Sequence, residues 1–433
     1  MRFKKLLFLC ALATIAGGAA WAELQNVELS GNLRIRGNYY GYDSLPDVSY
    51  IQERTRLGVK ADFTNDITAF VEFDSYSVWG EGFRSNYLTG IDTRGDADVS
   101  LYQGYIEVRN MWGVAPLTLK VGRQELKFGD QFLVGVNDAS SDYRGLSFDA
   151  VRLTYKTDVF SVDAVASKLA ETFNNFGKGD TDFYVLYGSY TGIENTTLDA
   201  YWMYLRDDGA LLPAGNTVDI NTIGLRGAGT LGSFDYKAEV AYQFGSIDDL
   251  PSACPSGFGT ADTDYGTFGI NSEIGYTFDA AWSPRPFARF AYFGGGDPDR
   301  SLCSNDRTLP FNRLFSNIEY SEFIETTDLS NVFYYAAGVD LVPMECIKLQ
   351  LVAAYFAADQ AGPVTDDSSL GWEAGLYGSY QYSEDLVFRA GYIHFFGDDG
   401  LEDAYIAANG LRQWGGDGDD QYDYLYIETE ISF

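Results

Sequence analysis

The stretch VELSGNLRIRGNY, residues 27–39, alternates apolar and polar side chains residue by residue. One face carries Val, Leu, Gly, Leu, Ile, Gly and Tyr, and the other carries Glu, Ser, Asn, Arg, Arg and Asn. Strict alternation predicts a β-strand with one apolar and one polar face. The run is longer than the usual globular strand of about five or six residues. It therefore predicts a long strand between apolar and aqueous surroundings.

The same alternation recurs in residues 56–63, 102–109, 236–243 and 347–351. A soluble barrel would turn the apolar face inward, but alternation alone leaves open which face is inside. The polar faces carry full charges on nearly every strand, and a protein core cannot hold that many. The sequence therefore predicts a transmembrane antiparallel up-and-down β-barrel, with the apolar face toward lipid and the charged face toward a water-filled lumen.

The connections between the expected strands alternate in length. Short turns are expected at residues 64–66, 110–116, 156–158, 192–195, 231–233, 279–283, 343–346 and 383–385. Longer polar stretches lie between them, for example at 80–98, 245–264, 294–331 and 397–420. This predicts about 18 strands, with short periplasmic turns and long extracellular loops, in a barrel wide enough for an aqueous channel.

Both ends of the chain indicate the bacterial outer membrane. Basic residues at the start, an apolar run over 6–20 and the small-x-small Ala20-Trp21-Ala22 predict a cleaved signal peptide over residues 1–22. Residues 23–433 are expected to form a single barrel domain. The last strand alternates up to Phe433, which resembles the sorting signature of outer-membrane proteins. We expect Phe433 to engage the barrel-assembly machinery and the outer face to contact outer-membrane lipid.

Composition excludes several function classes. His394 is the single histidine, so histidine-based hydrolysis and histidine metal sites are not expected. No nucleotide-binding motif is present, and we predict neither an enzyme nor a cofactor. Without the three basic residues of residues 1–22 the balance is 27 − 62 = −35, which argues against nucleic acid as a partner. The acidic excess falls in the expected connections, and the expected lumen face is near charge balance.

Two minor sites are candidates in the long connections. Cys254 and Cys303 lie in neighbouring loops and could form a disulfide. Acidic runs there could bind Ca²⁺ or be merely solvated. The weak calcium candidates are Asp398, Asp399, Asp417 and Asp419.

Four arginines cluster on the first two expected strands. A hairpin centred near Leu45 would place Arg34 opposite Arg56 and Arg36 opposite Arg54. Like charges opposite each other are destabilising, so something must neutralise them. Arginine also binds carboxylates in a bidentate manner, so an anionic solute is one possible partner. The other possibility is the acidic residues of the flanking strands, namely Glu72, Asp74, Glu428 and Glu430.

The stretches VGRQELKFGDQFLVG (residues 121–135) and YRGLSFDAVRLTY (residues 143–155) resemble the central signature of the alginate-export porin family. Weaker similarities follow through residues 371–383. The resemblance implies an 18-stranded barrel with an arginine-rich constriction that passes an anionic polysaccharide. The chain departs from the family pattern at Phe132, where Arg is favoured, and at Ala150, where Gly is favoured. The constriction residues implied by the motif are Arg123, Glu125, Asp130, Arg144, Asp149 and Arg152.

Simple alternation from Val121 would turn Arg123 toward lipid. The hydrocarbon of a bilayer does not tolerate a charged side chain. We therefore expect a bulge near Gly122 that turns Arg123, Glu125 and Lys127 inward. The loop that opens at Gly129 would then fold into the lumen and narrow it.

Taken together, the sequence predicts an outer-membrane porin that passes anionic polysaccharide or other carboxylate-bearing solutes by diffusion. The alternatives are a general porin of other selectivity and a surface adhesin or receptor acting through its acidic loops. The expected pathway residues are Arg34, Arg36, Arg54, Arg56, Arg123, Glu125, Lys127, Asp130, Arg144, Asp149, Arg152, Arg226, Arg289 and Arg389.

Overall fold

The computed structural model describes residues 23–43, 46–80, 98–138, 144–171, 179–208, 217–252, 259–296, 307–323, 329–361, 367–401 and 421–433. Within these residues the chain forms one sheet of 19 strands and a short 3-10 helix, η1 (Met111–Gly113). The strands are β1 (Leu24–Tyr42), β2 (Val48–Phe63), β3 (Ile67–Val78), β4 (Asp98–Val108), β5 (Leu117–Gln124), β6 (Phe148–Lys156), β7 (Phe160–Glu171), β8 (Asp180–Ile193), β9 (Thr196–Asp207), β10 (Thr217–Leu231), β11 (Phe234–Ser252), β12 (Gly259–Tyr276), β13 (Arg285–Phe293), β14 (Arg307–Leu309), β15 (Val332–Met344), β16 (Ile347–Ala358), β17 (Ser369–Gln381), β18 (Leu386–Gly397) and β19 (Gln421–Ser432).

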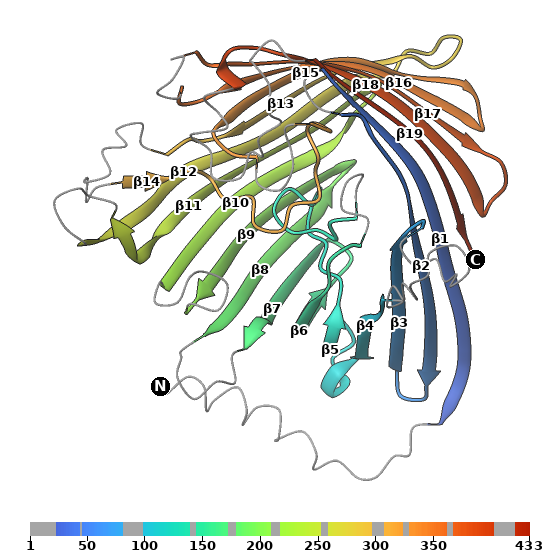
Figure 1. Cartoon of the computed structure of the whole chain (residues 1–433). Coiled ribbons are helices and arrows are strands. Elements are labelled where there is room, and N and C mark those ends of the chain that lie inside the picture. The colour runs from blue at the N-terminus through green and yellow to red at the C-terminus, as the bar shows by residue number, and fades with distance from the viewer. Residues whose placement is uncertain are drawn as a thin grey trace, which may run out of the picture.

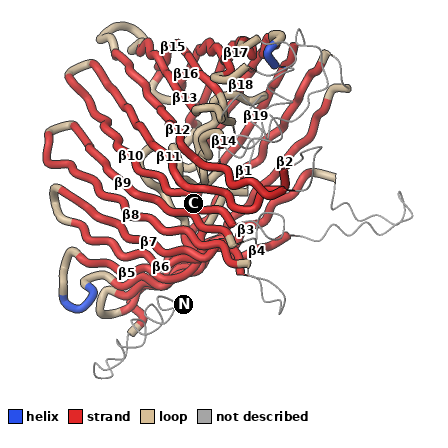
Figure 2. The backbone as a smooth tube through the Cα atoms, turned by 90° about the vertical axis from the view of Figure 1, so that its left-hand side faces the viewer, coloured by secondary structure: helices blue, strands red, loops and turns tan. Residues whose placement is uncertain are grey.

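The strands close into a barrel, seen from two directions in Figures 1 and 2. Each strand pairs antiparallel with the next, β13 pairs with β15, and β19 returns to pair with β1. Only the three-residue β14 stands apart, because it lies parallel to β12 in the connection between β13 and β15. The wall therefore has 19 − 1 = 18 strands, and the predicted fold class and strand number are confirmed.

The two faces of the wall differ as the alternation predicts. In β1, Arg34 and Arg36 are buried on the lumen face, whereas Leu29 on the other face is 70% exposed. Large apolar side chains are exposed along the outer face of β2, β9 and β16 as well. Lipid is the surrounding that such a face requires. Among the described residues, no helix has the length and apolar content needed to cross a bilayer.

The short turns lie where they are predicted. Between β2 and β3, Asn65 and Asp66 have φ values of 65° and 59°, a left-handed conformation that these residue types tolerate. The expected loop over residues 245–264 is wrong in part, because β11 continues to Ser252 and β12 begins at Gly259. Beyond the apolar band both faces of a strand are polar, so alternation does not mark the continued pairing.

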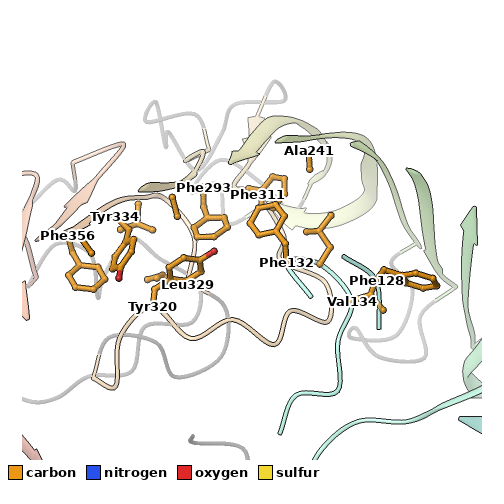
Figure 3. Packing of buried hydrophobic residues seen from close by; sticks show 14 of the residues in the cluster. Phe128, Phe132, Val134, Ala241, Phe293, Phe311, Tyr320, Leu329, Tyr334 and Phe356 are labelled. Carbon is orange, nitrogen blue, oxygen red and sulfur yellow. The ribbon is translucent and has the colours of Figure 1, made fainter. Parts of the chain in front are cut away.

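Two connections fold inside the barrel and contact each other (Figure 1). We call residues 125–138 the first inner segment and residues 310–323 the second inner segment. Gly135 N donates to Phe315 O and Phe315 N donates to Leu133 O, both at 2.8 Å, in a short parallel pairing. Their buried aromatic side chains pack with those of the wall into one cluster (Figure 3). The apolar core of this protein thus lies inside the barrel.

Candidate solute pathway

The four arginines of β1 and β2 line one side of the lumen, and we call them the arginine ladder. All four are at most 9% exposed. The register places Arg34 opposite Arg54, so two guanidinium groups face each other across the strands. The predicted register is wrong by two residues, because the hairpin is centred one residue earlier: Arg56 pairs with Asn32 and Arg36 with Gln52.

Acidic side chains of the neighbouring strands neutralise part of the ladder. Arg34 Nε and Arg36 Nε donate to Glu428 Oε2 on β19, at 2.9 and 2.7 Å. Arg56 Nε donates to Asp74 Oδ2 on β3 at 2.8 Å, and the Arg56 guanidinium lies 3.6 Å from the centre of the Tyr102 ring. Glu72 accepts from Gln103 at 2.8 Å and acts on Arg56 through its charge, without a direct hydrogen bond to it.

A further partner of the ladder is a carboxylate from inside the lumen. Asp138, at the end of the first inner segment, has an oxygen 3.4 Å from Arg54 Nη1 and 3.7 Å from Arg56 Nη1. Arg34 Nη1 donates to the backbone carbonyl of Asp138 at 2.8 Å. The sequence analysis missed Asp138, because a loop aspartate carries no periodic signal. Its position shows that the ladder can hold a carboxylate.

The first inner segment has a second charged attachment on another part of the wall. Arg226 on β10 donates to both carboxylate oxygens of Asp130, through Nη2 at 2.7 Å and Nε at 3.2 Å. Arg226 Nη1 also donates to Asp199 Oδ2 on β9 at 2.7 Å. Fork-shaped pairs of this kind fix orientation as well as distance. The segment is therefore tied to the wall near its middle, through Asp130, and at its end, through Asp138.

Phe132, the residue that departs from the family pattern, anchors the centre of the segment. Its side chain is fully buried, with its ring stacked on Phe293 at 5.8 Å and Phe311 at 6.3 Å between centroids (Figure 3). An arginine here would place its charge among aromatic rings. The apolar residue suits this packing, which joins both inner segments to β13.

The other predicted pathway residues on the lumen side have ionic, hydrogen-bonding or aromatic partners. Glu125 accepts from the Tyr102 hydroxyl, and Lys127 Nζ lies 3.0 Å from Glu125. The Arg144 guanidinium lies 4.8 Å from the Tyr76 ring centre. The wall arginines and their acidic partners are Arg152 with Asp163, Arg289 with Glu273, and Arg389 with Glu428 and Glu430. Lys127 and the three wall arginines are thus paired with acidic side chains, so the described lining is not purely basic.

Arg123 and Asp149 lie on the outer face, so the predicted inward orientation is wrong. Gly122 has a φ of 128°, but the pairing of β5 with β4 and β6 continues without a register shift. Arg123 therefore stays on the face of Val121. Its guanidinium binds both carboxylate oxygens of Asp149, each at 2.8 Å. The reciprocal pair is what allows the two charges to face outward.

Arg313 is a further buried residue of the second inner segment that the sequence analysis missed. It is 4% exposed, donates to Ser316 Oγ at 3.1 Å, and its guanidinium lies 5.1 Å from the ring centres of Phe293 and Tyr320. It therefore stabilises the bend of the segment. No pattern marks it, because the segment has neither strand nor helix periodicity.

The two minor predicted sites are largely outside the described residues. This holds for Cys254 and Cys303 and for Asp417 and Asp419. Asp398 and Asp399 are described, and across the described part of the chain no group of three or more His, Cys, Asp or Glu residues has a metal-binding arrangement. The disulfide and the calcium site remain predictions.

Solved structures with the same fold are outer-membrane channels of other bacteria. OccK8 (OprE) of Pseudomonas aeruginosa matches with a TM-score of 0.57 and 12% identity, covering 94% of this chain and 98% of that one. OccAB1 of Acinetobacter baumannii matches with a TM-score of 0.58 and 13% identity, covering 94% and 97%. At this identity the likeness concerns the fold alone. No curated protein sequence matches this chain.

A protein-family model shows a relationship in sequence, which the solved structures do not show. The model described as "Alginate export" matches residues 26–362, which include both inner segments and the wall from β1 to β16. The match confirms the family resemblance noted in the signature stretches. The chain is a non-enzymatic outer-membrane porin barrel, and it belongs to the alginate export family.

Proposed function

We propose that this barrel passes anionic polysaccharide or other carboxylate-bearing solutes by diffusion. The pathway would run between the inner segments and the arginine ladder, with the lumen residues predicted from the sequence as its lining. Arg123 and Asp149 are not included, since they face outward.

The observation that supports this proposal is the contact between Asp138 and the ladder. The carboxylate lies within 4 Å of both Arg54 and Arg56, and it belongs to a connection between strands and not to the wall. A solute carboxylate presents the same oxygens to the same guanidinium groups. A solute could therefore exchange with Asp138 at little cost, because one charge-assisted contact replaces another.

The test is planar-bilayer conductance in a salt gradient, with oligogalacturonate and a neutral oligosaccharide as blockers. The proposal expects ion conductance, a reversal potential on the anion side and block by oligogalacturonate alone. Cation selectivity without such block would contradict the polyanion pathway and leave a general porin. Absence of conductance would contradict a pore of any kind.

We also propose that the chain reaches the membrane through cleavage after Ala22 and assembly guided by Phe433. Support comes from the position of Phe433, whose backbone exchanges hydrogen bonds of 2.8 and 3.0 Å with Gly31 on β1. Its ring is 70% exposed on the outer face. The mass of the protein purified from outer membranes tests the cleavage, with a chain beginning at Glu23 as the expected result.

A further inference from the structure

Alanines form one row on the outer face of the wall from β13 to β17, whose strands lie side by side (Figure 2). The register pairs each alanine with the next across neighbouring strands, and the row continues to His394 on β18. The alanines are Ala288, Ala337, Ala353 and Ala374, and all four are exposed. Because an alanine side chain ends at Cβ, the row is a low line across a face that otherwise carries large apolar side chains.

Larger side chains border this row on both sides. Two residues along each strand toward the long connections lies an aromatic border, and two residues toward the short turns lies a mostly aliphatic one. The first border includes Tyr335, Tyr355 and Trp372, and the second includes Val339, Leu351 and Leu376. Between the borders lie two hollows of about 840 and 590 Å³, which share Ala337 and Ala353. We call this depression, with the alanine row as its floor, the outer groove.

The outer groove is inclined to the membrane and has the reach of one acyl chain. Its floor crosses four strand spacings, about 19 Å at about 4.8 Å each. Ala288 is 288 − 285 = 3 residues from the short-turn end of β13, and His394 is 394 − 386 = 8 residues from that of β18. At about 3.3 Å per residue and a tilt of about 35–45°, the floor descends about 12 Å along the barrel axis from His394 to Ala288. One leaflet of the hydrocarbon core is about 15 Å thick.

The end of the groove nearer the long connections is polar. His394 Nδ1 lies 2.8 Å from Asp423 Oδ1 on β19, and Tyr392 donates to the same carboxylate oxygen at 2.6 Å. The His394 side chain lines the groove and is 20% exposed, and within the described residues its Nε2 has no hydrogen-bond partner. A hydroxyl group suits this nitrogen, because it can donate to a neutral imidazole and accept from a charged one.

We propose that the outer groove is a lipid-binding site, which holds one acyl chain of an outer-leaflet lipid with a hydroxyl group of its head against His394. A straight chain fits a floor that is one side chain wide, whereas a second barrel presents a convex wall that cannot enter it. The polarity of a lipid also matches, since the floor is apolar and only the end nearer the aqueous surface is polar. The site faces away from the lumen, so it is independent of the solute pathway.

Native mass spectrometry of the barrel purified from outer membranes, with detergent removed in the instrument, counts the bound lipid molecules. The probe is 1-monopalmitoylglycerol, and we expect one molecule per barrel to remain bound. Ala353→Phe fills the floor with an apolar side chain that lipid tolerates, and it should lower retention about tenfold or more. Ala164→Phe is the matched control, because Ala164 is an exposed alanine on the outer face of β7. Its retention should equal that of the unmodified protein.

A second comparison tests the polar end of the groove. Methyl palmitate has the same chain without a hydroxyl group, and its retention should be about threefold to tenfold lower, as one hydrogen bond implies. In His394→Leu the two probes should be retained equally. Heat-modifiable mobility on gels confirms that each variant is a folded barrel.

The outcomes separate a specific site from ordinary contact with lipid. Equal retention in Ala353→Phe and the unmodified protein overturns the site, and so does an equal loss in Ala164→Phe. A dimer that disappears in Ala353→Phe overturns it as well and assigns the groove to a second barrel. If His394→Leu still retains monopalmitoylglycerol better than methyl palmitate, the placement of the head group against His394 is wrong.

Discussion

At the scale of single residues, Asp138 offers a test of how much of the arginine ladder is available to a solute. Its carboxylate lies 3.4 Å from Arg54 Nη1. In Asp138→Asn the competing charge is removed, so we expect a reversal potential shifted further toward anions and oligogalacturonate block about threefold to tenfold tighter. Single-channel recording in a salt gradient measures both. Asp130→Asn is the control that removes a charge from the same segment; an equal shift there would mean that only net charge matters.

Phe132 tests whether the departure from the family pattern is structural. Phe132→Arg buries a guanidinium between Phe293 and Phe311, and we expect a loss of about 3 kcal/mol in the free energy of unfolding. Phe132→Leu keeps the site apolar and should lose about 1 kcal/mol. Urea unfolding in lipid vesicles, followed by tryptophan fluorescence, measures these values. A stable Phe132→Arg variant would indicate that the lumen solvates this position.

At this scale the sequence predicted the composition of the pathway better than its contacts. Arg34, Arg36 and Glu428 were expected on the lumen face because strand alternation sets facing, and the structure places them there. Asp138 and Arg313 could not be expected, since facing in an irregular segment depends on tertiary packing. Arg123 was placed wrongly for an energetic reason. A lone charge avoids lipid, but Arg123 lies opposite Asp149 on the same face and is neutralised there.

At the scale of elements, the inner segments lie inside the barrel, and we expect them to set the width of the lumen. Phe315 joins them, with two backbone hydrogen bonds to the first segment and edge-on ring contacts to Phe148 at 5.2 Å and Phe183 at 5.0 Å. In Phe315→Ala the ring contacts are lost, and burial of such a ring is worth about 3–5 kcal/mol. We expect larger and noisier single-channel conductance than in the unmodified protein.

Limited proteolysis checks the origin of that change. A loosened segment should be cut between residues 125 and 138 while the barrel stays intact. Phe160→Ala is the control, because Phe160 lies at the outer face of β7 and is 40% exposed. Raised conductance in Phe160→Ala as well would show that the inner segments do not determine the width.

Strands and inner segments differ in how far sequence can specify them. The wall strands repeat one simple constraint, lipid on one side and water on the other, and so their period of two is visible in a single sequence. For the first inner segment, only the inward course after Gly129 was expected. The second was treated as part of a long loop, since its position depends on contacts with residues 131–135 that lie far away in sequence.

At the scale of the whole molecule, the outer face of the barrel is not uniformly apolar. The charged pair of Arg123 and Asp149 interrupts it on β5 and β6. β5 has six residue steps from Leu117 to Arg123. At about 3.3 Å per residue and a tilt of about 35–45°, the pair with Asp149 lies about 15 Å along the barrel axis from the start of the strand, a distance shorter than the height of an apolar band, which is about 25 Å. The register continues this polar row from Asp149 to Lys168 and then Asp182, on the outer face of β7 and β8.

This placement predicts strong coupling between the two charges. Asp149→Leu leaves Arg123 on the outer face without its partner and should lower the free energy of unfolding in vesicles by about 2–4 kcal/mol. The double variant Arg123→Leu with Asp149→Leu should lie within about 1 kcal/mol of the unmodified protein. Urea unfolding in vesicles gives the comparison. If the double variant loses as much free energy of unfolding as the two single substitutions together, the pair lies in water.

The first inner segment also has a mechanical consequence. It is fixed to Arg226 on β10 and to the ladder on β1 and β2, and β2 and β10 are 10 − 2 = 8 positions apart in a ring of 18. The two attachments thus lie on nearly opposite walls. A strut across the diameter resists flattening of the cross-section into an ellipse when the surrounding bilayer presses on it. Because the attachments are ionic, this stiffness should decrease as salt screens them.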